Sequence, residues 1–259
     1  MGVVSVRLMG GLGNMLFEIS TAYAVSIRDN KEFICNTNDM LIPHKPYSEY
    51  INNIFRKITF SGVTVEPFFG ENGFHYTQIP NIINDGMLVG YFQSEKYFMD
   101  YRNSIIDLFE IDEVTKNYLH SKYGDLIDKD TCSIHVRRGD YLGLSEYHPV
   151  LDIEYYQNSV NIVGEDKHYL IFSDDINWCQ DNFNFIKNKT IITNNLDYQD
   201  LYLMSLCKNN IIANSSFSWW GAWLNKNEDK KVIIPKIWFG DSYISYNTND
   251  LYCANWIKM

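Results

Sequence analysis

The sequence predicts an α/β protein that contains two largely parallel β-sheets. Short β-rich runs alternate with segments whose apolar residues recur at helical spacing, which is typical of parallel sheets covered by helices. The runs form two series, and a polar, turn-prone stretch at 122–130 lies between them. We therefore expect two Rossmann-like domains, 1–128 and 129–259, with a hinge in that stretch.

The first series opens with a predicted strand at 3–9, followed by a glycine turn and a helix. The helix is predicted because four apolar residues fall on one of its faces: Leu16, Ile19, Tyr23 and Ile27. The periodicity of residues 36–85 is too weak to predict elements. A strand at 87–92 and a helix over 98–108 close the series.

The second series alternates more regularly. Strands are predicted at 132–136, 169–172, 191–192, 211–213 and 232–234. Helices are predicted at 153–163, 176–183, 200–207 and 217–225. This order describes a doubly wound sheet, in which ligands bind beyond the carboxyl ends of the strands, so the segments that follow the strands are the candidate sites.

The net charge of −10 argues against a general polyanion binder, because such proteins depend on many Lys and Arg contacts to phosphates. We therefore expect no nucleic acid partner. A negatively charged protein can still bind a small anion if a few cations are concentrated in one place. The positions of the arginines are thus more informative than their number.

The cysteines are odd in number, far apart and without C-x-x-C spacing, so we expect buried thiols in a reducing compartment: Cys35, Cys132, Cys179, Cys207 and Cys253. The chain begins with a strand-like run, and no window approaches about eighteen uninterrupted apolar residues. We therefore expect no signal peptide, no membrane span and a cytoplasmic protein. Peripheral attachment to the inner face of the cell membrane remains open, although no basic amphipathic helix indicates it.

The first candidate segment, 10–14, follows the first strand and opens the first helix. Gly11 and Gly13 would let a ligand approach the backbone, and the helix N-terminus favours negative charge. The third glycine of G-x-G-x-x-G and the lysine of a Walker loop are both absent, which disfavours nicotinamide, flavin and P-loop sites. A tight turn without function is the alternative.

The second segment carries two adjacent arginines, Arg137 and Arg138, at the end of an apolar strand. Burying a guanidinium is costly unless an anion pairs with it, and its planar fork matches phosphate oxygens. A structural ion pair with Asp140 is the alternative. His135 by itself is interpreted more readily as a core histidine.

The third segment contains Asp174 and Asp175. A carboxylate there could accept paired hydrogen bonds from a guanine base, and helix N-capping is the alternative for either aspartate. A divalent metal site is disfavoured, because no further carboxylate stands close by in the sequence.

The fourth segment, 213–223, places hydroxyl groups between a strand and a helix start. Ser216, Phe217 and Ser218 could surround a diphosphate with side-chain and backbone donors, and helix capping by Ser215 or Ser216 is the alternative. The tryptophans at helical spacing are interpreted as core residues rather than a sugar platform: Trp219, Trp220 and Trp223.

Together these segments resemble the bacterial-type α-1,2-fucosyltransferases, a glycosyltransferase family that also includes the blood-group H enzymes. The similarity extends over most of the chain, and the order and spacing of the motifs make it specific. It comprises GGLGNMLF at 10–17, GYFQSEKYF at 90–98, the twin arginines, SDD at 173–175 and the run 203–224.

The resemblance implies a GT-B fold with two facing Rossmann-like domains. GDP-fucose would bind mainly to the C-terminal domain, the acceptor would approach from the N-terminal side, and no metal or other cofactor would be required. Donor-binding roles would fall to Arg137 at the β-phosphate with Arg138 in support, to His135 and Asp174 at the guanosine, and to Ser216, Phe217 and Ser218 at the diphosphate. Gly11 and Gly13 join this donor-binding set, and Asn14 would face the reacting centre.

The family inverts the anomeric carbon, so the resemblance implies a single displacement that converts GDP-β-L-fucose into an α-fucoside. Negative charge develops on the departing GDP, and Arg137 is the candidate that stabilises it. The attacking hydroxyl needs a base, for which Asp140 and Glu146 are the candidates.

The sequence departs from the family pattern at three positions. Met15 and Glu18 stand where glutamine is usual, and Asn209 stands where many members carry histidine. Loss of the glutamine at Met15 suggests that the group bound beside the glycine turn is smaller or less polar.

The expected acceptor is a terminal galactose of a surface polysaccharide. Alternatives are a transferase for another GDP-sugar, one forming a 1,3 linkage, and a sugar-nucleotide-binding protein without turnover. The sequence gives no prediction of oligomeric state.

Overall fold

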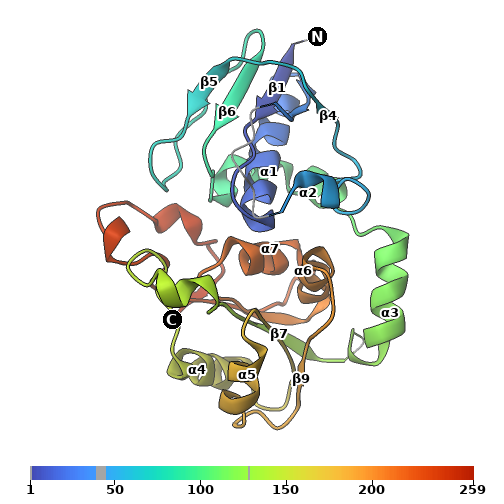
Figure 1. The fold of residues 1–259 in the computed structure, drawn as a ribbon, viewed down its shortest axis with the longest axis vertical. Helices are drawn as coiled ribbons and strands as arrows, with labels where there is room; N and C mark the ends of the chain where they lie inside the picture. The colour runs from blue at the N-terminus through green and yellow to red at the C-terminus, as the bar shows by residue number, and fades with distance from the viewer. Residues whose placement is uncertain (1, 39–44, 128) are drawn as a thin grey trace. The chain divides into compact units, whose positions relative to one another are not determined.

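The computed structural model describes residues 2–38, 45–127 and 129–259, which form two compact units (Figure 1). The first unit comprises Met1–Asp112 and Tyr246–Cys253, and the second comprises Glu113–Ser245 and Ala254–Met259. This division differs from the predicted single boundary between 128 and 129, and residue 128 itself lies outside the described residues. The chain passes from the first unit to the second, back again, and then returns to the second.

Helix α3 (Glu113–Ile127) accounts for the first difference, because it belongs to the second unit. The hydroxyl of Tyr118 and the ammonium group of Lys122 each donate a hydrogen bond to Asn195 Oδ1 at 2.8 Å. Asn195 precedes helix α6 of the same unit, so these bonds fix α3 against it.

The segment 246–253 accounts for the second difference. The carboxylate of Asp250 accepts hydrogen bonds from the Tyr76 backbone N–H at 2.8 Å and from Lys96 Nζ at 2.5 Å. Its carbonyl oxygen accepts a third from the Ser94 hydroxyl at 2.6 Å. Asp250 thus contributes three hydrogen bonds that attach this late segment to the first unit.

The first unit contains a four-stranded parallel sheet in the order β2-β1-β6-β5. Its strands are β1 (Val3–Val6), β2 (Glu32–Phe33), β5 (Pro67–Gly70) and β6 (Gly86–Val89). A separate parallel pair is formed by β3 (Cys35–Asn36) and β4 (Phe60–Ser61), and the helices are α1 (Leu12–Arg28) and α2 (Arg102–Leu108). The predicted strands at 3–9 and 87–92 correspond to β1 and β6, and the helix predicted through 16–27 corresponds to α1.

The second unit contains a six-stranded parallel sheet in the order β12-β11-β10-β7-β8-β9. Its strands are β7 (Thr131–Val136), β8 (His168–Ser173), β9 (Lys189–Ile191), β10 (Asn209–Ile211), β11 (Val232–Ile234) and β12 (Ile257–Lys258). The helices besides α3 are α4 (Ile153–Val163), α5 (Ile176–Asn182), α6 (Asp197–Leu206) and α7 (Ser216–Leu224). Figure 1 shows α4 and α5 on one face of this sheet and α6 and α7 on the other.

Short 3₁₀ helices complete the described elements: Tyr47–Glu49, Glu95–Tyr97, Met99–Tyr101, Asp140–Gly143, Asp241–Tyr243 and Asn249–Leu251. The helix predicted over 98–108 is therefore α2 preceded by a 3₁₀ turn. None of the described helices is both long and apolar enough to cross a lipid bilayer.

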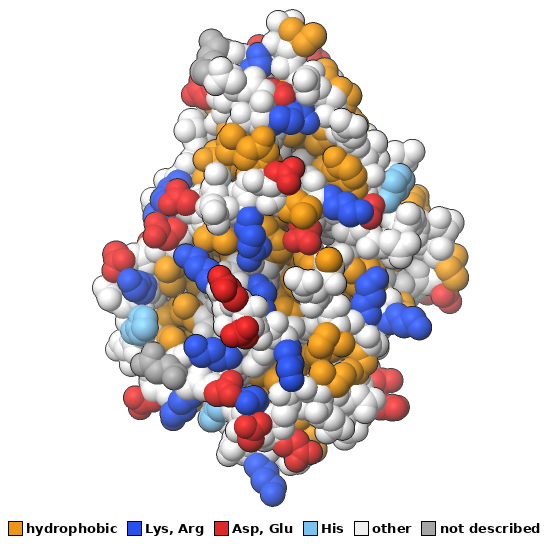
Figure 2. Space-filling model, turned by 180° about the vertical axis from the view of Figure 1, so that it is seen from behind, with side chains coloured by type: hydrophobic (Ala, Val, Ile, Leu, Met, Phe, Trp, Pro, Cys, Tyr) orange, Lys and Arg blue, Asp and Glu red, His pale blue; other side chains and the backbone are white. Residues whose placement is uncertain are grey.

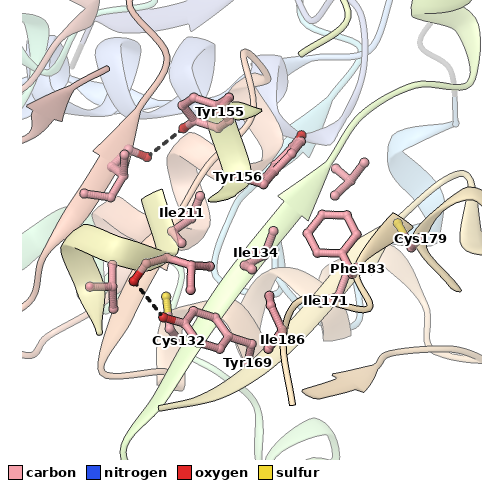
Figure 3. Close-up of a cluster of buried hydrophobic side chains, with 14 residues drawn as sticks. Cys132, Ile134, Tyr155, Tyr156, Tyr169, Ile171, Cys179, Phe183, Ile186 and Ile211 are labelled. Atoms are coloured by element: carbon pink, nitrogen blue, oxygen red, sulfur yellow. Dashed lines mark hydrogen bonds between the residues drawn. The ribbon is translucent and has the colours of Figure 1, made fainter. Parts of the chain in front are cut away.

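One core cluster of the second unit lies between its sheet and helices α4 and α5 (Figure 3). Its tyrosines bury their rings and satisfy their hydroxyl groups on the backbone, as Tyr155 does on Ile212 O and Tyr169 on Gly164 O, both at 2.7 Å. Burial of a ring is favourable when the hydroxyl group keeps a partner. The five cysteines are all buried free thiols, as the sequence indicates.

On the face of the molecule drawn in Figure 2, acidic and basic side chains are interspersed. Several charged side chains of the protein pair locally, as Lys57 does with Asp107 at 2.9 Å and with Glu110 at 3.2 Å. Exposed pairs of this kind contribute little to stability, so the charges that carry chemical information are those gathered at a strand end.

Candidate active site

The sheet of the second unit reverses its winding between β7 and β10. From β7 the chain proceeds outward through β8 and β9, then returns to β10 on the other side of β7 and continues to β11 and β12. The connections that leave two such neighbouring strands diverge, and the crevice between them is the usual ligand site of an open α/β sheet. The arginine segment follows β7, the 213–218 segment follows β10, and the aspartates follow β8. Three of the predicted segments thus meet at one edge of this sheet.

Arg137 is paired with two carboxylates. Its Nη2 lies 2.7 Å from Asp140 Oδ1 and its Nη1 lies 3.0 Å from Asp174 Oδ2. The guanidinium carbon lies 5.4 Å from the ring centroid of Tyr141. One third of the Arg137 side chain remains exposed, so the guanidinium is oriented from several sides and can still be reached from solvent.

Arg138 is less exposed than Arg137 and is held by three contacts. Its backbone N–H donates to Asp174 Oδ1 at 2.9 Å, its Nε donates to Asp175 Oδ2 at 3.2 Å, and its guanidinium lies 4.1 Å from the Trp178 ring centroid. A cation at this distance over an indole face is attracted by the ring quadrupole. These contacts make Arg138 the fixed partner of the arginine pair.

Gly139 lets the two strand ends approach closely. A Cβ atom at this position would lie 2.8 Å from Asp174 Oδ2, so a larger residue would push the aspartate away from both arginines. The glycine between the arginines and Asp140 is thus explained by the position of Asp174 across the sheet.

Asp174 and Asp175 have different roles. Both oxygens of Asp174 are engaged by the two arginines, whereas Asp175 Oδ1 accepts the Trp178 backbone N–H at 3.1 Å and caps helix α5. The capping alternative is therefore correct for Asp175. Among the described residues, no group of three or more His, Cys, Asp or Glu side chains is arranged to hold a metal ion.

His135 is the penultimate residue of β7 and is buried, 6% exposed, with its ring centroid 5.5 Å from that of Phe217. Burial, with a smaller contribution from the charge of Arg137, lowers the pKa of His135 to about 3. The ring is therefore neutral at pH 7, and in the described part of the chain its Nδ1 has no hydrogen-bond partner. A buried polar nitrogen without a partner is costly in a folded protein and suits a group that a ligand completes.

The N-terminus of α7 faces the same strand ends. Ser215 is the N-cap residue, with no side-chain capping bond, and the first turn contains no acidic residue. The N–H groups at the start of a helix lack intrahelical acceptors and carry partial positive charge, which favours an anion. Side-chain capping by Ser215, an alternative for this segment, is not observed.

Ser218 is less accessible to a diphosphate than its position at the start of α7 suggests. Its side chain is almost fully buried, and its hydroxyl donates to the carbonyl oxygen of Ser215 at 3.3 Å. The three tryptophans of α7 are also buried, which agrees with the core interpretation: Trp219, Trp220 and Trp223.

The two candidate bases lie in different environments. Asp140 is paired with Arg137, whereas the Glu146 side chain is exposed and its backbone carbonyl accepts the Ser242 N–H at 3.0 Å. Asp140 is thus already neutralised by a guanidinium, and Glu146 is anchored through its main chain.

The glycine turn of the first unit brings Asn14 and Gln93 together. Gly10 has a φ of +69°, and a Cβ atom there would lie 2.5 Å from Asn14 Nδ2. Asn14 Oδ1 accepts a hydrogen bond from Gln93 Nε2 at 3.0 Å, while Gln93 Oε1 is buried and has no partner among the described residues. Gly11 is the N-cap of α1, and Gly13 is buried in its first turn. Gln93 was not among the predicted site residues, although it stands in the motif at 90–98.

The structure places the side chain of Met15 in the core of the first unit, where it is fully buried. The change from glutamine to methionine therefore suits a packed position, and the size of the group bound at the turn stays a prediction. Asn209 is likewise structural, since its Oδ1 accepts the Lys231 backbone N–H at 2.9 Å.

Glu18, the other departure, is fully buried in α1. Its Oε2 accepts the Met9 N–H at 2.9 Å, and its Oε1 has no partner among the described residues. Burial raises the pKa of Glu18 well above its usual range. Burial thus favours the neutral, protonated form of this acid at a position where the family usually has a neutral amide.

The chain resembles several curated glycosyltransferases along most of its length. It is 30% identical to the O-antigen biosynthesis glycosyltransferase WbnK of Escherichia coli, over 97% of this chain and 99% of that protein. It is 29% identical to an alpha-1,2-colitosyltransferase of Escherichia coli, over 100% of this chain and 99% of the relative. A galactoside 2-alpha-L-fucosyltransferase of Caenorhabditis elegans is 25% identical, over 99% of this chain and 79% of the relative.

Among solved structures, NodZ alpha-1,6-fucosyltransferase soaked with GDP-fucose superimposes with a TM-score of 0.56 at 12% identity, over 86% of this chain and 92% of NodZ. This likeness confirms the predicted GT-B type of α/β fold. The model of glycosyl transferase family 11 matches residues 1–259. The chain therefore belongs to glycosyl transferase family 11.

Proposed function

We propose that the protein transfers L-fucose from GDP-β-L-fucose to a hydroxyl group of a terminal galactose, forming an α-1,2 linkage by a single inverting displacement. The observation that carries the proposal is the edge between β7 and β10, where Arg137, the N-terminus of α7 and the unpartnered nitrogen of His135 lie on adjacent strand ends. Cations, free backbone donors and a neutral polar ring are what a nucleoside diphosphate requires.

Arg137 is the proposed group that stabilises the departing GDP. Charge develops on the diphosphate as the bond to fucose breaks, and a fixed guanidinium stabilises that charge without reorganisation. Arg138 and Asp174 would keep the guanidinium in place. Donor binding would replace one carboxylate partner of Arg137 by phosphate oxygens.

Glu146 is the preferred candidate for the base that accepts the proton of the acceptor hydroxyl, because the Asp140 carboxylate is already paired with Arg137. We propose that the reaction requires no cofactor, since GDP-fucose is a substrate. Asn14 of the first unit stays a proposed contributor to the reacting centre, and Gly11 and Gly13 stay proposed donor contacts.

A second candidate donor is a nucleotide-linked colitose. It is favoured by the similarity over the full chain to a protein named alpha-1,2-colitosyltransferase. Colitose is L-fucose with one hydroxyl group fewer, so a single site could be built for either sugar.

The test is to incubate the purified protein with GDP-fucose, GDP-colitose, GDP-mannose or UDP-galactose, with and without lactose and with EDTA. Release of GDP from GDP-fucose, increased by lactose and accompanied by an α-1,2-fucosylated product, is expected. Faster transfer from GDP-colitose would assign the second donor. GDP binding without release from any donor, across several galactoside acceptors, would identify a non-catalytic binding protein, and activity lost in EDTA and restored by a metal would contradict the cofactor proposal.

A further inference from the structure

A continuous series of aromatic rings leads from Arg137 to the surface of the second unit. We call it the aromatic ladder, and its members are, from the inside outward, Tyr141, His148, Phe239, Tyr243 and Tyr147. Successive ring centroids lie 4.7, 5.8, 5.3 and 5.6 Å apart. The innermost ring is the one that packs against the Arg137 guanidinium.

The two segments that carry the ladder are joined through their backbones. The Gly240 N–H donates to Tyr147 O at 2.9 Å, and the Ser242 N–H donates to Glu146 O at 3.0 Å. A Cβ atom on Gly240 would lie 2.4 Å from Glu146 O, so only glycine permits this approach. At the inner end the Tyr141 hydroxyl donates to Asn214 O at 3.0 Å. The ladder is thus preformed rather than assembled from loose loops.

The outer end of the ladder is open to solvent. Tyr141 is 8% exposed, His148 and Tyr243 are partly buried, and Tyr147 is 43% exposed. The exposed carboxylate of Glu146 stands beside Tyr147 in the chain. An exposed carboxylate and an exposed ring on consecutive residues offer a hydrogen-bond acceptor and an apolar face.

The charge of these segments limits what they can bind. Residues 139–152 and 237–247 contain no lysine or arginine, and their acidic residues are Asp140, Glu146, Asp152 and Asp241. A surface that binds anionic lipid or a phosphorylated partner needs cations, so this composition favours a neutral, polyhydroxylated ligand.

We propose that Tyr147 and Tyr243, the outer rings of the ladder, form a binding surface for the sugar acceptor, with Glu146 accepting hydrogen bonds from its hydroxyl groups. This inference rests on the proposed function, since it concerns the second substrate of the same reaction. The C–H face of a pyranose is apolar and slightly positive, and an aromatic ring presents a negative face to it. The ladder would connect this surface to Tyr141, the ring that packs against Arg137.

The test compares Tyr147→Ala, Tyr147→Phe and the control Phe185→Ala. Phe185 is 37% exposed and stacks on Phe183 at 5.5 Å, in the connection that leads into β9, at the edge where the strands begin. Steady-state KM values for lactose and GDP-fucose are measured together with lactose binding by saturation-transfer NMR. Tyr147→Ala is expected to raise the KM for lactose about threefold to tenfold, more than any change in the KM for GDP-fucose. Tyr147→Phe retains the ring and is expected to restore the KM, and Phe185→Ala is expected to match the wild type.

The outcomes separate this inference from the proposed function. An unchanged KM for lactose in Tyr147→Ala overturns the inference while the transferase activity stands. If the wild type releases GDP from no donor, the proposed function fails, and the NMR signal of lactose decides the inference by its loss or persistence in Tyr147→Ala. Persistence of that signal, with loss of liposome binding or of a dimer in Tyr147→Ala, would assign the surface to a bilayer or a second copy and contradict the inference.

Discussion

The two carboxylate partners of Arg137 are held with different firmness. Asp174 is fixed by the Arg138 backbone and by the close approach of Gly139, whereas the Asp140 side chain is 40% exposed. An exposed pair contributes little free energy, so a diphosphate can displace Asp140 more readily than Asp174. Asp140 therefore competes with the donor for the guanidinium.

Removing the charge of Asp140 is expected to strengthen nucleotide binding. Asp140→Asn should lower the Kd for GDP about threefold to tenfold, because it removes a competing anion at 2.7 Å from Arg137. Isothermal titration calorimetry measures this change. The control is Asp130→Asn, whose carboxylate pairs with Lys167 at 2.6 Å just before β7, at the opposite edge of the sheet. A weaker GDP affinity in Asp140→Asn would show that Asp140 supports the donor.

Glu18 is expected to cost stability at neutral pH. The unfolded chain ionises this carboxyl above its usual pKa, and burial keeps it protonated in the folded state, so the free energy of unfolding falls as the pH rises. Glu18→Gln removes this cost and can keep the hydrogen bond from Met9. The variant should gain about 1.4 kcal/mol over the wild type for each pH unit above about 4.5, up to the raised pKa.

Urea denaturation of both proteins between pH 4 and pH 8 tests this expectation. The two stability curves should converge at the acidic end and separate toward neutral pH. A constant difference across the range would mean that Glu18 does not change its protonation between the folded and unfolded states. Met15, in the same helix, shows what comparison with a family motif does not reveal. Its position in the glycine motif is evident from the sequence, but its burial in the core is not.

At the scale of elements, α7 offers a test in which stability and ligand binding change in opposite directions. Its first turn lacks acidic residues, and an aspartate there interacts favourably with the helix dipole, by about 0.3–1 kcal/mol. Ser216→Asp should therefore raise Tm slightly and weaken GDP binding at least about tenfold, because the carboxylate occupies the anion position. The matched variant Ser216→Asn adds the same volume without charge. Equal GDP affinity in both variants would place the diphosphate elsewhere.

The elements that the sequence predicted correctly are those with strong periodicity or complete burial. All six residues of β7 are buried, and its apolar run is evident from the sequence. Helix α3 was missed because only three of its residues are buried, Thr115, Leu119 and Tyr123, which leaves little amphipathic signal. Strands β2, β3, β4 and β12 have two residues each, too few for any period to appear.

The candidate site was predictable in outline for a related reason. Parallel strands bring their carboxyl ends to one edge, so the segments after β7, β8 and β10 had to converge. The pairing of Arg137 with Asp174 and the capping role of Asp175 depend on how neighbouring strands align, which a single sequence does not encode locally. The aromatic ladder was missed for the same reason, since its two segments are distant in sequence.

At the scale of the whole molecule, the segment 246–253 returns to the first unit, and Asp250 binds it there. Its side chain is 19% exposed and accepts hydrogen bonds from the Tyr76 backbone and from Lys96, so its loss removes two exposed interactions that hold the segment 246–253. Asp250→Ala is expected to destabilise the first unit by about 0.5–1.5 kcal/mol. Hydrogen exchange should become faster in peptides that cover 76–97 and 246–253, and the β7 and β8 peptides of the second unit should keep their protection.

Asp229→Ala, at an exposed aspartate of the second unit, is the control and should leave both patterns unchanged. Equal acceleration in the β7 and β8 peptides would mean that the units unfold together, and that the segment 246–253 stabilises the chain as one cooperative structure.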